Sequence, residues 1–175
     1  TREEPFLVSL IDVVSIVDAK KSYRVLPSKK GLMLVPIKSD EAAFKLYRIE
    51  DKTIVKGGQL QLDLHDGTCS VIGAYNSQSS EEDVYQTLDV LQLSIPEREI
   101  LGHTKLTVGA NAIVIGGKNM GKVGKVTTID KKPNQKRRDT IVTIEDTNGS
   151  QFQTILNFVF ILGDKASSIS VPEAA

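Results

Sequence analysis

Residues 59–67 read QLQLDLHDG, and this stretch decides the fold class. Leucines occupy every second position from 60 to 64, and polar residues occupy the positions between them. A period of two is typical of a β-strand with one buried face and one solvent-facing side. Asp66-Gly67 is a turn signal, so residues 68–72 are expected to return as the antiparallel partner strand.

Short apolar segments of the same kind recur along the chain. Valine, isoleucine and threonine number 17, 16 and 12, against only 9 alanines, a composition that favours strands over helices. A short helix is expected at 40–44, capped by Ser39, and the polar, acidic stretch 76–83 is expected to be a surface loop. Strands are expected in residues 6–17 (one or two), 23–26 paired with 32–37, 44–49, 59–64, 68–72, 84–95, 110–115, 121–129, 140–145, around 152, and 158–162.

The pattern predicts a mostly β protein of two domains. A boundary near 96–105 separates a central β-barrel-like domain at 6–97 from a second domain at 98–163. Five short strands in about 60 residues, with an Asn-Gly hairpin turn at 148–149, suit a small barrel. Residues 164–175 are small and polar and are expected to be a flexible tail.

Composition excludes several classes of protein. With 175 residues, 40% apolar and 25% charged, the chain can bury a core of its own. No apolar run approaches the roughly 18 residues of a membrane helix, so no membrane partner is expected. The single Cys69 cannot form an internal disulfide, which fits a reducing cytoplasm. Two histidines and one cysteine are too few for most zinc sites, and we expect no metal and no cofactor.

The net charge of zero conceals an uneven distribution. Residues 1–100 hold 12 basic and 16 acidic residues, whereas residues 101–175 hold 10 and 6. The segment 118–138 is strongly basic, and such a density of like charge favours an anionic partner. Its eight basic residues are Lys118, Lys122, Lys125, Lys131, Lys132, Lys136, Arg137 and Arg138.

Residues 116–122 read GGKNMGK and match the first seven positions of a phosphate-binding P-loop. The eighth position should carry a Ser or Thr hydroxyl for magnesium, and Val123 has none. A P-loop also opens a helix, whereas residues 124–129 read as a strand. Nucleotide hydrolysis is therefore not expected, and the glycines are interpreted as tight turns between strands.

Two other features are candidates for catalysis or for metal ligation. His65 beside Asp66 resembles half of a catalytic dyad, but no nucleophile accompanies it, so His65 is interpreted as a turn-stabilising residue or an RNA contact. The acidic run 81–83 is interpreted as a solvated loop rather than a cation site. No enzyme activity and no small-molecule substrate are expected.

Glycine-interrupted strands carrying lysines resemble a KOW motif, an element of SH3-like barrels that commonly bind RNA or protein. The hydrophobic–glycine–hydrophobic pattern is formed by residues 112–115, Gly121, Gly124, Val126 and Ile129. The second domain is therefore expected to be an SH3-like barrel of the KOW type.

An ordered set of motifs resembles the archaeal and eukaryotic small-subunit ribosomal protein family "S four e". FKLYRI at 44–49, VKGG at 55–58 and QLDLHDG at 61–67 resemble its central signature. LIDVV at 10–14, SIP at 94–96, the KOW element and FVFILG at 158–163 follow the family order. Family members carry an N-terminal RNA-binding domain, and the sequence from Thr1 onward is expected to lack a counterpart of it.

The resemblance implies a structural constituent of the small ribosomal subunit that binds ribosomal RNA and supports translation in the cytoplasm. Its partners would be small-subunit ribosomal RNA and neighbouring ribosomal proteins. The alternative is a KOW-containing transcription or translation factor that acts mainly by protein–protein binding. The residues expected to contact RNA are Lys45, Arg48, Lys56, His65, Lys118, Lys122, Lys125, Lys131, Lys132, Lys136, Arg137 and Arg138.

Overall fold

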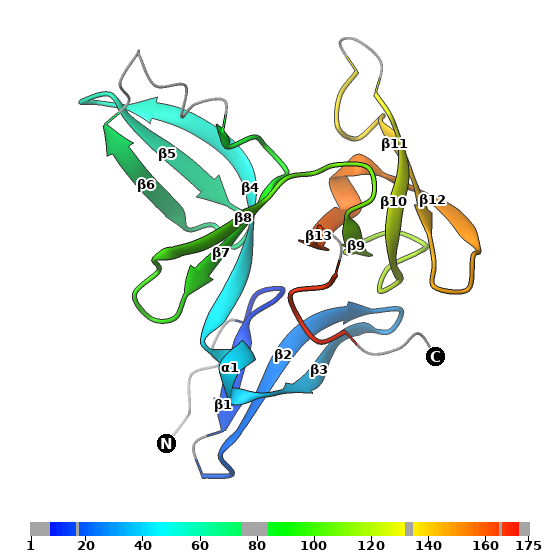
Figure 1. Cartoon of the computed structure of the whole chain (residues 1–175), viewed down its shortest axis with the longest axis horizontal. Coiled ribbons are helices and arrows are strands. Elements are labelled where there is room, and N and C mark those ends of the chain that lie inside the picture. The colour runs from blue at the N-terminus through cyan, green and yellow to red at the C-terminus, as the bar shows by residue number, and fades with distance from the viewer. Residues whose placement is uncertain (1–7, 17, 75–83, 132–134, 165, 172–175) are drawn as a thin grey trace.

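The structure, a computed structural model, describes residues 8–16, 18–74, 84–131, 135–164 and 166–171. The described chain folds into three antiparallel sheets, one of three strands and two of five (Figure 1). The expectation of a mostly β protein is confirmed, and the stretch 76–83, expected to be a loop, lies outside the described residues.

The first sheet has the order β1-β2-β3, and its main feature is the long β2–β3 hairpin. The hairpin expected between 23–26 and 32–37 is present and longer than expected, because pairing continues from Ser22↔Ile37 to Ser28↔Gly31. The strands are β1 (Val13–Ile16), β2 (Lys21–Ser28) and β3 (Gly31–Ile37).

The central sheet has the order β6-β5-β4-β7-β8. The alternation of leucines has the expected effect, since Leu60, Leu62 and Leu64 are all buried while the residues between them are partly exposed. The one-turn helix α1 (Ser39–Ala42) precedes the sheet, with Lys38 at its N-cap position rather than Ser39. The strands are β4 (Phe44–Val55), β5 (Gln59–Leu64), β6 (Cys69–Ala74), β7 (Val90–Ser94) and β8 (Ile100–Thr104).

The third sheet is the expected small SH3-like barrel, with the order β12-β11-β10-β9-β13. Gly124 is required in it, because a Cβ there would lie 2.3 Å from the backbone oxygen of Glu145. The Asn-Gly turn is also present, with Gly149 at φ +76°. The elements are β9 (Asn111–Val114), β10 (Val123–Asp130), β11 (Ile141–Glu145), β12 (Gln151–Ile155), the 3-10 helix η1 (Leu156–Phe158) and β13 (Val159–Gly163).

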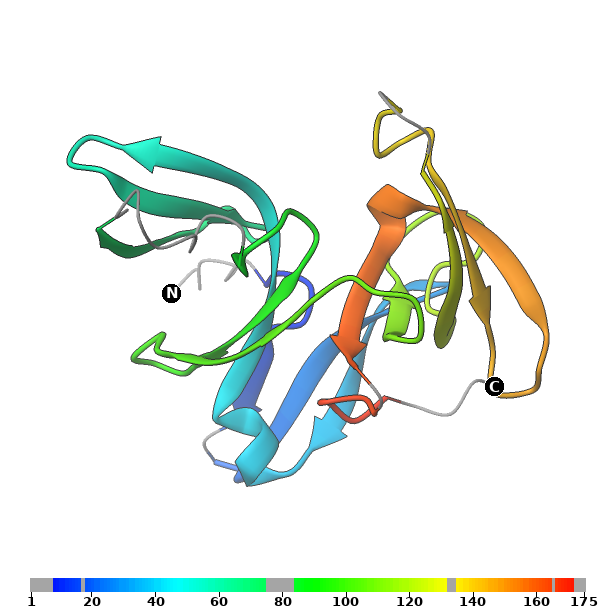
Figure 2. The ribbon, with the colours of Figure 1, turned by 45° about the horizontal axis from the view of Figure 1, so that its top comes forward.

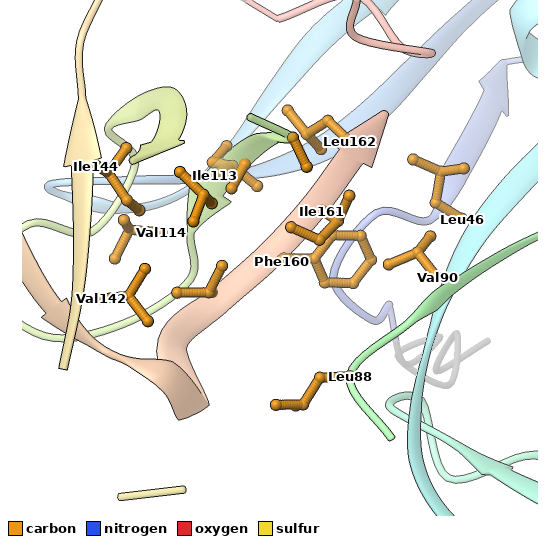
Figure 3. Packing of buried hydrophobic residues seen from close by; sticks show 14 of the residues in the cluster. Leu46, Leu88, Val90, Ile113, Val114, Val142, Ile144, Phe160, Ile161 and Leu162 are labelled. Atoms are coloured by element: carbon orange, nitrogen blue, oxygen red, sulfur yellow. The ribbon is translucent and has the colours of Figure 1, made fainter. Parts of the chain in front are cut away.

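One hydrophobic core joins the barrel to the rest of the molecule. Phe160 and Ile161 of β13 lie between barrel residues and Leu46 and Val90 of the central sheet (Figure 3). Leu26 of β2 belongs to the same buried cluster. The two sequence domains are therefore packed against each other rather than held by a linker alone.

Three boundaries differ from the sequence-based expectation. β8 pairs with β7, so the central sheet extends past 97 to Thr104. Of the segment 84–95, only 90–94 is a strand, because Leu88 has a positive φ of 76° that interrupts extended backbone. Of the segment 6–17, the described strand covers only 13–16.

The segment after β13 is not a free tail over its described residues 166–171. Ile169 is buried in the main core, and the Ser170 hydroxyl donates to Glu41 Oε2 at 2.6 Å. Glu41 also pairs with the fully buried Arg24 at 3.1 Å. Figure 2 shows this segment beside β2 and β3. The small, polar composition of residues 164–175 predicts a flexible tail, and the single isoleucine that anchors the segment adds no periodic pattern that would indicate otherwise.

Candidate nucleic-acid interface

The expected basic residues of the barrel lie at and beyond the two ends of β10. Eight strand residues span roughly 25 Å, so the two groups are separate. Lys131, Lys136 and Arg138 follow β10, at the end of that strand that lies away from the first sheet (Figure 1). Lys118 and Lys122 precede the strand, and Lys125 is exposed on it.

Most of the described basic side chains between β10 and β11 are exposed, and most of their charge is not neutralised by a close carboxylate. The Arg138 side chain is 71% exposed, and its closest carboxylate, Asp139, is 3.9 Å away. Lys131 and Lys136 are exposed and form no ion pair with any other residue that the structure describes. Lys132 lies outside the described residues. Of the basic segment 118–138, Lys131, Lys136 and Arg138 thus have exposed side chains.

Arg137 differs from its neighbours because it turns toward the central sheet. Its Nη2 donates to the backbone oxygen of Glu50 at 2.7 Å, and its Nη1 lies 3.5 Å from Glu50 Oε2. The side chain is 36% exposed, so it remains accessible at the edge of this contact. Arg137 therefore joins the barrel to β4.

The glycine-rich segment 116–122 is a turn, and the strand β10 follows it. A Cβ on Gly116 or Gly117 would lie 2.9 or 3.0 Å from the ring of Phe158, so the turn is packed against an aromatic side chain. The backbone amides thus lack the helix that gives a P-loop its phosphate cradle. The interpretation of these glycines as turn residues is confirmed.

Lys122 lies beside a basic pair that the sequence analysis did not include. Lys29 and Lys30 form the tip of the β2–β3 hairpin, and both line one groove with Lys122. The sequence does not indicate this proximity, because nearly one hundred residues separate the hairpin from Lys122. Gly121 has a φ of +85°, and a Cβ on it would lie 2.9 Å from the Ser28 Cα. The two turns therefore meet backbone to backbone.

Lys45 was expected to contact RNA, but it is buried and already paired. Its Nζ lies 2.6 Å from Asp12 Oδ1 and 2.9 Å from Asp66 Oδ2, and 4.4 Å from the centre of the Tyr47 ring. Burial by itself raises the pKa of Asp66, but hydrogen bonds from Thr68 and the pairing with Lys45 outweigh it and lower that pKa to about 2. The charge of Lys45 is therefore neutralised by two carboxylates of the same chain.

Arg48 was also expected to contact RNA, but its guanidinium is bonded within the chain. Its Nη1 donates to the backbone oxygens of Asn157 at 3.0 Å and Val159 at 2.9 Å, and its Nε donates to Glu50 at 2.7 Å. The side chain is only 6% exposed. Arg48 thus connects β4 to the residues that begin β13, and Glu50 links it to Arg137.

His65 is held inside the same junction. The backbone N–H of Arg48 donates to its Nδ1 at 3.2 Å, so the other nitrogen, Nε2, carries the proton and donates to the Leu10 oxygen at 3.0 Å. Its ring packs edge-on against Phe160, with 5.2 Å between ring centres. Burial lowers the pKa of His65, because an imidazolium would be poorly solvated there.

We therefore withdraw Lys45, Arg48 and His65 from the RNA-contact set. All three side chains are buried or partly buried and already form hydrogen bonds or ion pairs within the chain. None of them presents a free charge to a phosphate. Their sequence neighbours gave no sign of this, because charged residues within a strand are normally on its wet face. Lys56 is exposed in the turn after β4 and remains in the set.

Other chemistry is scarce in the described chain. Among the residues that the structure describes, no three His, Cys, Asp or Glu side chains gather in a way that could hold a metal ion. Cys69 is exposed, and its thiol donates to Asp63. No helix of the described chain is long and apolar enough to cross a membrane.

Two family models match the chain. The one described as "Ribosomal family S4e" matches residues 19–100, and the KOW motif matches residues 108–161. Small ribosomal subunit protein eS4 of Staphylothermus marinus is 47% identical over 96% of this chain and 66% of its own length. The protein of the same name from Desulfurococcus amylolyticus is 46% identical over 99% of this chain and 69% of its own length. The chain belongs to the eS4 family.

The family membership confirms the resemblance found in the sequence, including the KOW element. The chain spans about two thirds of the length of these eS4 relatives. A crystal structure of the 30S ribosomal protein S4e from Thermoplasma acidophilum has the same arrangement, with a TM-score of 0.73 and 27% identity over 96% of this chain and 79% of that one. The three sheets are thus an eS4 arrangement.

Proposed function

We propose that this eS4 chain is a structural constituent of the small ribosomal subunit in the cytoplasm, where it binds ribosomal RNA and supports translation. Its relatives carry the name of a small ribosomal subunit protein. The observation that carries the RNA contact is the exposed group Lys131, Lys136 and Arg138 at the far end of the barrel. We call this group the barrel-end cluster.

The binding mechanism is electrostatic. Lysine and arginine side chains at the barrel-end cluster neutralise backbone phosphates and release the counterions condensed on them. RNA duplexes are recognised mainly by shape and backbone, so these contacts require no base-reading side chains. Lys118, Lys125 and Lys56 are also exposed and are proposed as further phosphate contacts apart from this cluster.

The proposed partners include neighbouring ribosomal proteins. Leu32 and Leu34 of the edge strand β3 are 58% and 57% exposed, and large exposed apolar side chains on one strand suit a protein contact. This same observation supports the alternative function of a KOW factor that binds mainly protein. A salt-dependence experiment separates the two proposals.

The experiment replaces the three residues of the barrel-end cluster with serine and measures affinity for small-subunit ribosomal RNA between low and moderate salt. Three lost phosphate contacts should reduce the slope of log affinity against log salt by roughly 2–3, at about 0.7–0.9 per contact. The control replaces Lys20, Lys21 and Lys38, exposed at the base of the β2–β3 hairpin, and changes net charge equally. An unchanged slope in the folded triple variant would favour the protein-binding alternative.

We also propose that the chain has no enzymatic activity. The P-loop-like segment 116–122 lacks both the magnesium-binding hydroxyl and the following helix. Mg-ATP should therefore leave the melting temperature unchanged, and any nucleotide-dependent rise of several degrees would contradict the proposal. A ligand at one hundred times its Kd would stabilise the fold by about 2.7 kcal/mol, which thermal unfolding detects readily.

A further inference from the structure

A groove of about 550 Å³ lies where the β2–β3 hairpin meets the turn before β10. Its lining combines three lysines with several apolar side chains and a few uncharged or acidic polar ones. Its lining includes Lys29, Lys30, Lys122, Met33, Met120 and Asp146.

The charges around the groove suit an anion. Lys29 and Lys30 are exposed, and Lys122 is held 4.7 Å from the centre of the Phe152 ring. Asp146 is the only carboxylate among the described lining residues, and its Oδ1 already accepts the backbone N–H of Thr147 at 2.7 Å. The described lining thus holds three lysines and one carboxylate, and an oxygen of that carboxylate is already hydrogen-bonded.

The lining between the lysines suits a flat aromatic group. Met33 is 36% exposed at the groove, and Met120 reaches it from the opposite turn. Methionine side chains are polarisable and adaptable, and their sulfur makes favourable contacts with aromatic rings. An anion with an aromatic ring attached matches both halves of this surface, and a nucleotide is such a group.

We propose that the groove holds one unstacked nucleotide of ribosomal RNA, with its base against Met33 and Met120 and its phosphate at the lysines. The inference rests on the proposed function, but it names a different mode of binding from that of the barrel-end cluster. Bases that are splayed out of loops and bulges are accessible to side chains, whereas the bases of an A-form duplex are not. A phosphate contact alone would leave the methionines uncovered.

The two methionines make the test direct, because they are the only methionines in the chain. Protein labelled with carbon-13 at the methionine methyl groups gives two signals, both from the groove, and Met33→Leu assigns them. A short single-stranded oligoribonucleotide should shift both signals with one common Kd. A blunt, fully paired RNA duplex should bind through charge and leave both methyl signals in place.

A variant pair tests the lysines independently. Lys29→Ser with Lys30→Ser removes two groove lysines from an exposed hairpin tip, and Lys20→Ser with Lys21→Ser is the charge-matched control. For single-stranded RNA the groove variant should lose up to about 0.7 in salt slope, the value for the one phosphate at the lysines, and the control should lose none. Equal losses in the two variants would overturn the inference.

The remaining outcomes separate the groove from the proposed function. Methyl signals that stay in place while the barrel-end variant still loses salt slope would overturn the groove site alone. Absence of any salt-dependent RNA binding by the wild-type chain would overturn both. Shifts produced equally well by an acidic polyglutamate peptide would assign the groove to a protein partner instead.

Discussion

Arg48 and Arg137 contact the two different oxygens of the Glu50 carboxylate, yet they should differ greatly in their contribution to stability. Arg48 is nearly buried, whereas Arg137 is 36% exposed. We expect Arg48→Met to destabilise the chain by about 2–4 kcal/mol. Arg137→Met should cost at most about 1 kcal/mol, because exposed ion pairs contribute little.

The expected loss of stability in Arg48→Met comes from the hydrogen bonds that a methionine side chain cannot form. The guanidinium donates to two backbone oxygens, those of Asn157 and Val159, and hydrogen bonds to charged groups contribute about 1.5–3 kcal/mol each. The contact with Val159 is buried, whereas that with Asn157 is partly open to water, so its loss is smaller. Glu50 keeps Arg137 as a partner, which limits the cost of the lost ion pair.

The assay is urea unfolding followed by far-ultraviolet circular dichroism, since the chain has no tryptophan. The double variant should cost more than the sum of the single variants, because it leaves Glu50 without either cation. RNA affinity of Arg48→Met should keep the wild-type salt slope. A cost for Arg48→Met no larger than that for Arg137→Met would refute the assignment of Arg48 to the junction between β4 and β13.

Two further perturbations test the packing. Gly124→Ala should destabilise the chain by about 2–3 kcal/mol in urea unfolding, because its Cβ would lie 2.3 Å from the Glu145 oxygen. The control Gly102→Ala should be close to neutral, because its Cβ would lie 3.6 Å from the nearest atom. Because the folded pKa of His65 is below the unfolded value of about 6.5, the unfolded state binds more protons, and stability should decrease as the pH drops through 6.5 toward the folded pKa. His65→Gln, which keeps one donor and one acceptor, should flatten this decrease between pH 7.5 and 5.5, and an equally steep loss in that variant would contradict the role given to His65.

Local pattern determined much of the fold. The alternating leucines at 60, 62 and 64 specify both the strand and its buried face, because a period of two places them on one side of the sheet. The Asn-Gly turn at 148–149 was likewise predictable, since only residues close in the chain are involved. The glycines at 121 and 124 were also visible in the sequence, but the backbone atoms of Ser28 and Glu145 that exclude a side chain there are brought close only by the fold. The ordered motifs were sufficient to indicate the family.

Tertiary structure alone decided which charges are free. Lys45, Arg48 and Lys131 are equally basic in the sequence, but only Lys131 remains exposed, because the other two find buried acceptors on distant elements. Arg48 and Val159 are 111 residues apart, and no local pattern reports such a pairing. The groove was not predictable from the sequence for the same reason. Lys29 and Lys30 line it together with Lys122 only because two turns from different sheets touch. A side chain's propensity depends on its neighbours in sequence, whereas its charge is available or neutralised according to which surfaces meet.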